Sequence, residues 1–224
     1  ALMAIATALW LPPSPHQPTA RTVSLGKVLR SGLGAYADPR LRDLLLTGVM
    51  LFMSFALIQQ TLGFLFQDHF GLSPAAAARA LGLTMMAAAV TSLFGQIVVV
   101  QWLRAPATLL VALAVPALGA GALILWLADQ QLVMSFAVLL VGLGLGFGMP
   151  AIMSLASLRV SSEEQGRVAG LASACPALGF ILGPLVGTGL YTLDHRWPYL
   201  LVMSLMVPLA WLAWRLVRSA ADSA

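Results

Sequence analysis

Long apolar runs alternate with short polar segments along the chain from about residue 41 onward. A run of about 20 apolar residues can cross a hydrocarbon layer about 30 Å thick as an α-helix, which rises 1.5 Å per residue. Each run reaches this length, so the pattern predicts an all-α membrane bundle of six spanning helices. Their expected bounds are 42–66, 75–102, 107–127, 132–158, 164–192 and 198–217.

Polar residues mark the starts of two of these runs. Ser73 precedes Pro74, and this order suits a helix start because serine caps free backbone N–H groups and proline needs no donor in the first turn. Ser161 stands three residues ahead of Glu164, which is the spacing of a capping box. We therefore predict that the fifth helix begins near Glu163.

The segments outside the bundle, 42–217, differ from it in character. Residues 1–11 are apolar but too few to span a bilayer, and they lack the basic start of a signal peptide. We expect them to be the end of a preceding transmembrane helix, so that the chain is a fragment of a longer protein. Residues 12–41 are rich in Pro, Gly and basic residues and are expected to form a cytoplasmic linker, and residues 218–224 a cytoplasmic tail.

Composition supports a polytopic membrane protein. Hydrophobic residues make up 60% of the chain and charged residues only 9%, whereas about a quarter of the residues in soluble domains are charged. The net charge of +4 comes from short loops rather than from one soluble face, which argues against a nucleic-acid partner. Membrane lipid is the partner that this composition indicates. The single cysteine, Cys175, excludes an intrachain disulfide.

The arginines and the lysine are unequally divided between the two ends of the predicted bundle. Cytoplasmic loops collect Lys and Arg, so the richer side is expected to be cytoplasmic, with both ends of the bundle on it. That side holds Arg21, Lys27, Arg30, Arg40, Arg42, Arg104, Arg159, Arg167, Arg215 and Arg218. The other side holds Arg79 and Arg196.

Small residues recur at helical spacing in the fourth and fifth runs. Residues four apart share a helix face, where the absence of side chains lets a neighbouring backbone approach, and proline can bend a helix. These residues predict either bending and sliding surfaces or simply tight packing. The positions concerned are Gly142, Gly146 and Pro150 in the fourth run, and Gly166, Gly170, Gly179, Gly183, Pro184 and Gly187 in the fifth.

The fifth run and the loop before it resemble a known family. EEQGRVAG, followed by Gly179-x-x-x-Gly183-Pro184-x-x-Gly187-Thr188 and Leu190-Tyr191, is similar to the eleventh helix and preceding loop of major facilitator superfamily transporters. The likeness is greatest to the drug:proton antiporter and tetracycline-efflux branch, whose antiporter motif ends in a glycine where Thr188 stands here.

This resemblance implies that the chain is the carboxyl-terminal half of such a transporter, built from two inverted three-helix repeats. It also implies a missing amino-terminal half of six helices and a bacterial-type inner membrane. The polar content fits, because the third and sixth runs are almost purely apolar and are expected to be the outer helices, whereas the other four runs carry polar groups or rows of glycine.

Carboxylates, lysines and histidines are absent from the central part of every predicted span. A membrane-embedded enzyme or metal centre needs a buried base or a set of ligands. The sequence therefore predicts no enzyme, no metal site and no cofactor. By the same reasoning, a carboxylate that couples transport to protons would have to lie in the missing half, where the resemblance implies such groups.

Polar groups within the spans are the candidates for contact with a solute. Burying the amides of Gln59 and Gln60 toward lipid would be costly, and Thr84 and Thr91 lie seven residues apart on one face. The alternative is that they form hydrogen bonds between helices and touch no solute. Met149 is a candidate for an adaptable apolar wall or for ordinary packing.

The function predicted from these features is transport of a small molecule by alternating access. Efflux of a drug-like or amphipathic compound is favoured by the antiporter-like GFILGPLVGT, and coupling to protons would pass through the missing half. Two alternatives stay open at this point: uptake of a metabolite by the same fold, and a self-contained six-helix protein that dimerises or scaffolds a partner.

Overall fold

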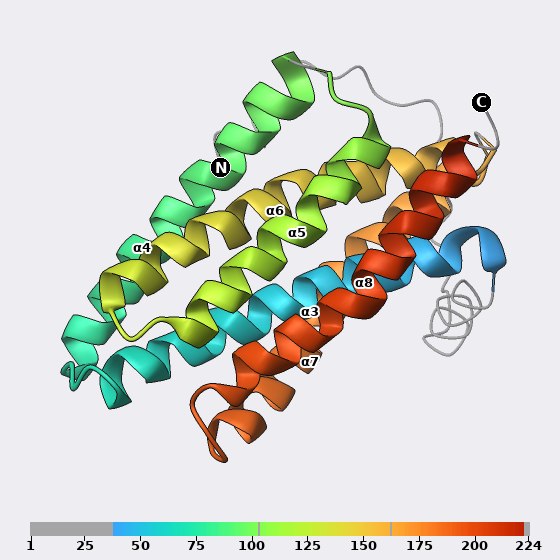
Figure 1. Ribbon diagram of the computed structural model, residues 1–224. Coiled ribbons are helices and arrows are strands. Elements are labelled where there is room, and N and C mark those ends of the chain that lie inside the picture. Colours follow the sequence, from blue (N-terminus) through green and yellow to red (C-terminus); the bar gives the residue numbers. More distant parts are fainter. Residues whose placement is uncertain (1–37, 103, 162, 222–224) are drawn as a thin grey trace, which may run out of the picture. The chain divides into compact units, whose positions relative to one another are not determined.

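The computed structural model describes residues 38–102, 104–161 and 163–221, and the regular elements in these ranges are all helical (Figure 1). The predicted preceding span at 1–11 and nearly all of the predicted linker at 12–41 lie outside the described residues. Six helices in the described part are long and apolar enough to cross a membrane, as predicted. Their bounds are α3 Pro39–Asp68, α4 Pro74–Phe94 continued by η1 Gly95–Trp102, α5 Ala107–Leu127, α6 Gln131–Leu158, α7 Gln165–Tyr191 and α8 Trp197–Ala221.

Capping explains where several helices begin. The Ser73 hydroxyl accepts a hydrogen bond from the backbone N–H of Ala76 at 3.3 Å, as its place before Pro74 predicts. The helix α3 begins three residues earlier than expected because the Asp38 carboxylate accepts from the Arg40 N–H at 2.9 Å, a cap that the apolar pattern does not reveal.

The predicted capping box before α7 does not form among the described residues. The helix begins at Gln165, and its cap Glu164 makes no side-chain capping bond. Instead the Glu164 N–H donates to the Ser161 carbonyl at 3.0 Å, which makes a turn and delays the helix start by two residues. At the other end of the bundle's sequence, α8 extends to Ala221 and takes in the first residues of the predicted tail.

The second spanning run changes its winding near its end. The sequence predicts one helix over 75–102, but from Gly95 onward the chain forms the π-helix η1. A Cβ atom on Gly95 would lie only 2.9 Å from the Phe147 ring on α6, so glycine is needed where the wider helix begins.

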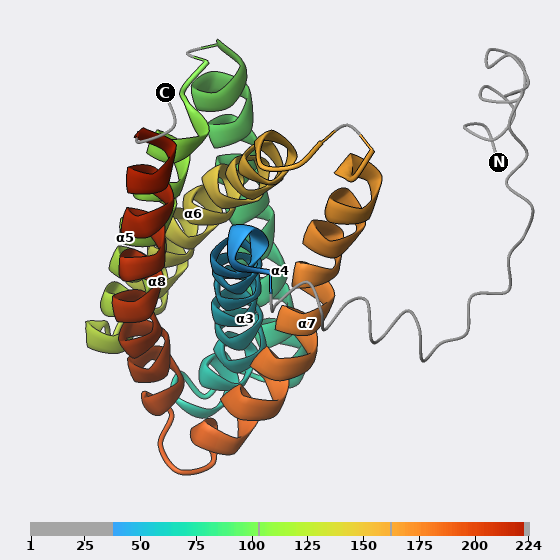
Figure 2. The same ribbon diagram turned by 90° about the vertical axis from the view of Figure 1, so that its right-hand side faces the viewer.

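The helices pack as two interlocked groups of three, α3–α4–α5 and α6–α7–α8 (Figures 1 and 2). The first helix of each group packs on the second helix of the other, α3 on α7 and α6 on α4. The third helix of each group packs on the first of the other, α5 on α6 and α8 on α3. This exchange of equivalent contacts is the arrangement expected of two three-helix repeats, and it confirms the predicted fold class.

Glycines set the distance between the helices at two of these contacts, α6 on α4 and α7 on α3. A Cβ atom on Gly146 would lie 2.5 Å from the Ser92 carbonyl oxygen, and one on Gly142 would overlap the Ala88 carbonyl oxygen of α4. On α7, a Cβ atom on Gly179 would lie 2.6 Å from the Met53 nitrogen of α3. The backbones therefore approach as closely as small-residue contacts in membranes allow.

Only one of the two glycine rows predicted in α7 makes such contacts. Gly179, Gly183 and Gly187 pack on α3, with Gly183 2.8 Å from the Met53 carbonyl oxygen when a Cβ is added. A Cβ atom on Gly166 or Gly170 would meet nothing within 4 Å in the described structure. The same four-residue spacing thus serves packing in the second half of α7 and leaves an open surface in the first half.

Exposure of apolar side chains is not confined to the helices expected to be outermost. The helices α5 and α8 do carry large exposed apolar side chains, such as Leu127 and Val207. However, α4 is the least buried of the spans, with Leu83, Met86 and Val90 each more than half exposed. Polar content alone does not reveal this, because the few polar groups of α4 face α6 and leave an apolar surface on the opposite side.

The glycine contacts yield a first prediction. Gly183→Val places atoms against the Met53 carbonyl and the Ala56 Cβ, both at 2.8 Å, and such overpacking costs about 1–3 kcal/mol of unfolding free energy. For a chain of 224 residues, in which 1 kcal/mol shifts the unfolding midpoint by about 2–4 °C, we expect the midpoint to fall by about 2–12 °C. The fall is measured on protein purified in detergent by the reaction of the buried Cys175 thiol with a fluorescent dye during heating.

Gly170→Val is the matched control on the same helix, because it adds the same side chain where nothing lies within 4 Å. Equal midpoints for the two variants would show that the contact between α3 and α7 does not depend on glycine.

Candidate functional site

A small cavity lies between α3, α4 and α6, beside the closest approach of α4 and α6. Its volume is about 250 Å³. The lining residues are Phe55 and Gln59 from α3, Met85, Ala88, Ala89 and Ser92 from α4, and Gly142 and Leu145 from α6.

Gln59 gives this cavity most of its capacity to form hydrogen bonds. Its side chain is half-buried and its amide offers both donors and an acceptor. The second polar group, the Ser92 hydroxyl, accepts a hydrogen bond from Gln96 Nε2 at 3.4 Å. Neither group is charged, so the cavity can orient a solute by hydrogen bonds without selecting for its charge.

The rest of the wall is apolar and adaptable. Phe55, Met85 and Leu145 line the cavity, and methionine fits varied shapes because its side chain is unbranched. The Phe55 ring also meets the Phe180 ring of α7 edge to face, with centroids 6.0 Å apart. A shift of α7 against α3 would therefore move the Phe55 ring in the cavity wall.

Of the five residues predicted to contact solute, the structure places Gln59 in the lining of this cavity and the other four outside it. Gln59 lines the cavity, whereas its neighbour Gln60 is exposed outside it. Thr84 and Thr91 form hydrogen bonds to α6, from the Thr84 hydroxyl to the Ser135 hydroxyl at 3.0 Å and from the Thr91 hydroxyl to the Leu139 carbonyl at 3.1 Å. This is the interhelical role that the alternative reading gave them. Met149 is partly buried and is not among the cavity-lining residues.

Sequence reasoning did not select three of the residues that shape the site. Ser92 and Leu145 line the cavity, and Ser135 pairs with Thr84 where α4 meets α6, outside the lining of the cavity. The signal for Ser92 is its four-residue spacing from the small residue Ala88, which marks the face of α4 that approaches α6. Nothing in the local sequence of Ser135 indicates its partner, which lies 51 residues away.

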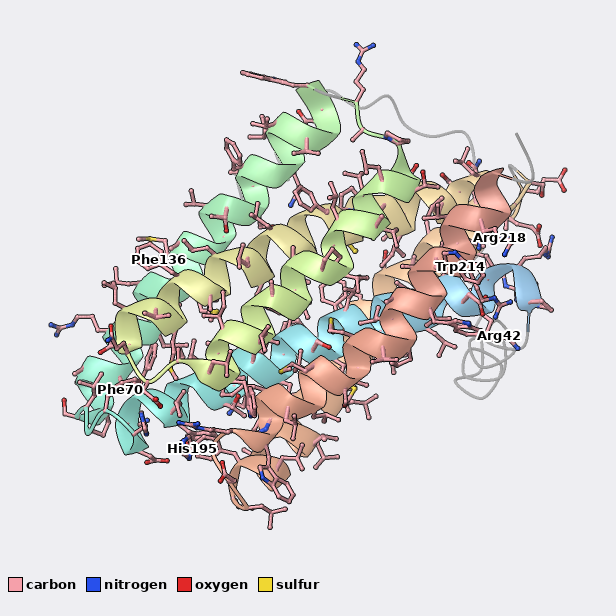
Figure 3. The ribbon with its side chains drawn as sticks, in the orientation of Figure 1. Arg42, Phe70, Phe136, His195, Trp214 and Arg218 are labelled. Carbon is pink, nitrogen blue, oxygen red and sulfur yellow. The ribbon has the colours of Figure 1, made fainter. Side chains whose placement is uncertain are left out.

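Charged residues gather at one end of the bundle, here called the basic end, where Figure 3 shows Arg42 and Arg218. Arg159 and Arg215 lie at the same end, in a pocket that they line together with Asp43. Asp43 is buried among them and pairs with Arg215 at 3.1 Å and with Arg42 at 3.3 Å. Burial lowers the pKa of the Arg159 guanidinium, and the nearby Asp43 carboxylate acts in the opposite direction. This network joins the starts of α3 and α7 to the ends of α6 and α8, since Arg40 also reaches Glu164 at 3.8 Å.

The opposite end is held by a second network of loop residues. The Arg196 guanidinium donates to Asp129 at 2.6 Å and so joins the loop before α8 to the loop before α6. The rings of His69 and His195 stack there with centroids 5.2 Å apart. Within the described ranges no group of three or more His, Cys, Asp or Glu side chains is placed to hold a metal ion.

The geometry of Thr84 predicts a structural role that can be separated from transport. Thr84→Val and Ser135→Ala each remove one hydroxyl of the 3.0 Å pair, so their effects on unfolding should not be additive. We expect a coupling free energy of about 0.6 kcal/mol, the average for such pairs in membranes, in a double-mutant cycle of unfolding midpoints. Strict additivity would show that the two hydroxyls do not interact.

Comparison with known proteins bears on the whole chain. No curated protein matches the chain closely. The family model of the Major Facilitator Superfamily, in contrast, matches residues 1–184 and, in a second and overlapping match, residues 119–224. These two matches together extend over the full sequence. The chain belongs to the major facilitator superfamily, a family of membrane transporters.

Proposed function

We propose that this chain forms the carboxyl-terminal half of a transporter that moves a small molecule across the membrane by alternating access. The observation that carries the proposal is the cavity between α3, α4 and α6, in which the Gln59 amide stands in an otherwise almost apolar wall. Binding sites for small molecules combine an apolar lining with a few placed polar groups, and this cavity has that composition.

The character of the wall favours an amphipathic, drug-like compound. The cavity holds no charged side chain, so its affinity would come from apolar contact with Phe55, Met85 and Leu145 and from one or two hydrogen bonds to Gln59. Its volume of about 250 Å³ is small for a whole drug-sized ligand, and a facing half would complete the site. Efflux as the direction rests on the antiporter-like run Gly179–Thr188.

Coupling to protons is proposed to pass through that facing half. In the described spans the carboxylates lie near helix ends, where Asp43 is held by two arginines. A proton-coupled transporter needs a titratable group along its pathway. An amino-terminal half of six helices would have to supply it.

The proposed orientation places the basic end in the cytoplasm of a bacterial-type cell, at its inner membrane. It rests on the arginine distribution, because Arg40, Arg42, Arg159 and Arg215 meet at one end of the bundle and Arg196 lies at the other.

The glycine contacts are proposed to act during the conformational cycle. Gly142 and Gly146 let α6 lie against α4, and Gly179, Gly183 and Gly187 let α7 lie against α3 without interlocking side chains. Surfaces of this kind can shift without large rotamer changes. Pro150 in α6 and Pro184 in α7 each remove a backbone donor and so provide points at which these helices can bend.

The proposal predicts that substitution of Gln59 lowers transport and that substitution of Thr84 does not. Gln59→Leu keeps the size of the side chain and removes its hydrogen bonds, so transport should fall by about 2- to 10-fold, the worth of one hydrogen bond. Thr84→Val should leave transport close to the unaltered protein, because its hydroxyl faces Ser135. The assay is accumulation of a fluorescent amphipathic dye in cells that lack their own exporters, with and without expression of the full gene.

Expression of the unaltered gene should lower dye accumulation, and a protonophore should abolish this effect. Higher accumulation on expression would indicate uptake instead of efflux. If Gln59→Leu lowers neither the rate nor the apparent affinity, the cavity between α3, α4 and α6 is not the solute site.

A further inference from the structure

An apolar groove runs between α5 and α8, and none of its lining residues lines the Gln59 cavity. The two helices lie side by side (Figures 1 and 2). The volume of the groove is about 530 Å³. Small residues open it: Ala112, Pro116, Gly119 and Ala120 on α5, and Ala210 and Ala213 on α8.

The groove exists because small residues line α5 and α8 beside their contact. Within that contact, a Cβ atom on Gly119 would lie 3.2 Å from Met206 Cγ. Ala112, Ala120 and Ala210 are exposed and leave a channel along the helices that no described side chain fills. A channel of this form suits a flexible apolar chain that lies along the helix axes.

The groove becomes polar only where it reaches the basic end. Trp214 lines it there, and the Arg218 guanidinium lies over the Trp214 ring, 5.2 Å from the ring centre (Figure 3). Tryptophan and arginine together are typical of the level at which lipid headgroups lie, since the ring is amphipathic and the arginine can reach water.

Arg218 differs in its charge partners from the neighbouring arginine. Arg215 lies over the Trp211 ring in the same manner, but its charge is balanced by Asp43 at 3.1 Å. Within the described part of the chain no carboxylate oxygen lies within 4 Å of the Arg218 guanidinium. The positive charge at the end of the groove therefore complements an anion.

We propose that the groove between α5 and α8 binds an anionic phospholipid. One acyl chain lies along the small residues of the groove, and the phosphate of the headgroup interacts with Arg218 and with the indole N–H of Trp214. A drug-like solute fits less well, because the lining offers no polar group along its length to orient such a molecule. The bound lipid would fill the space between α5 and α8 and join the two helices.

The test uses the purified full chain in detergent and native mass spectrometry. Phosphatidylglycerol, which is anionic, and phosphatidylcholine, which is zwitterionic, are added with identical acyl chains. We expect phosphatidylglycerol to be retained about five-fold more than phosphatidylcholine, which is the effect of one arginine at the membrane surface. Arg218→Gln should abolish this preference, and Arg218→Lys should keep most of it.

A second variant tests the position of the acyl chain. Ala210→Phe fills the groove from its exposed side and should lower retention of both lipids. The matched control is Val207→Phe on the same helix, where the side chain is 73% exposed and does not line the groove. Arg79→Gln removes an exposed arginine at the opposite end of the bundle and controls for net charge.

Equal retention of the two lipids by the unaltered protein would overturn the proposal. So would an unchanged preference in Arg218→Gln, an effect of Arg79→Gln as large as that of Arg218→Gln, or unchanged retention in Ala210→Phe. Unfolding midpoints followed at Cys175 show that each variant is folded. The measurement does not depend on transport, so its failure and the failure of the proposed function can be told apart.

Discussion

Close contact between helix backbones is the constraint on which this fold depends. In hydrocarbon the hydrophobic effect does not hold helices together, so packing and hydrogen bonds between helices must do so. Here α6 meets α4 at Gly142 and Gly146, and α7 meets α3 at Gly179 and Gly183, each with no room for a Cβ atom. These two equivalent contacts lock the three-helix groups together. They also place the cavity, which lies beside the α4–α6 contact and has Gly142 and Ala88 in its lining.

The same close contacts decide which polar groups remain available to a solute. Thr84 and Thr91 lie where α4 meets α6 and form hydrogen bonds with Ser135 and with the Leu139 carbonyl. Thr47 and Thr61 on α3 donate to carbonyls of their own helix. These four hydroxyl groups thus form hydrogen bonds within the bundle. Gln59 lines the cavity, and its amide is the proposed contact for a solute.

The spanning helices could be predicted because length and hydropathy are properties of the local sequence. Their observed bounds agree with the expected ones to within about four residues, and the differences at α3 and α7 come from capping by Asp38 and a turn at Glu164. The glycine rows were predicted only in part. Spacing shows that Gly166 and Gly170 share a face, but not whether another helix lies against that face. The roles of Gln59 and Thr84 could not be distinguished either, since helical spacing does not say which neighbour each side of a helix meets.

The central claim is that Gln59 lies in a cavity that opens to each side of the membrane in turn. Its most direct test is the labelling of a Gln59→Cys variant by a membrane-impermeant thiol reagent, applied in separate experiments to either side of the membrane. The native Cys175 gives little background because it is 1% exposed. The account predicts that position 59 reacts from both sides and that a transported compound slows both reactions. Reaction from one side only, whatever compound is present, would contradict it.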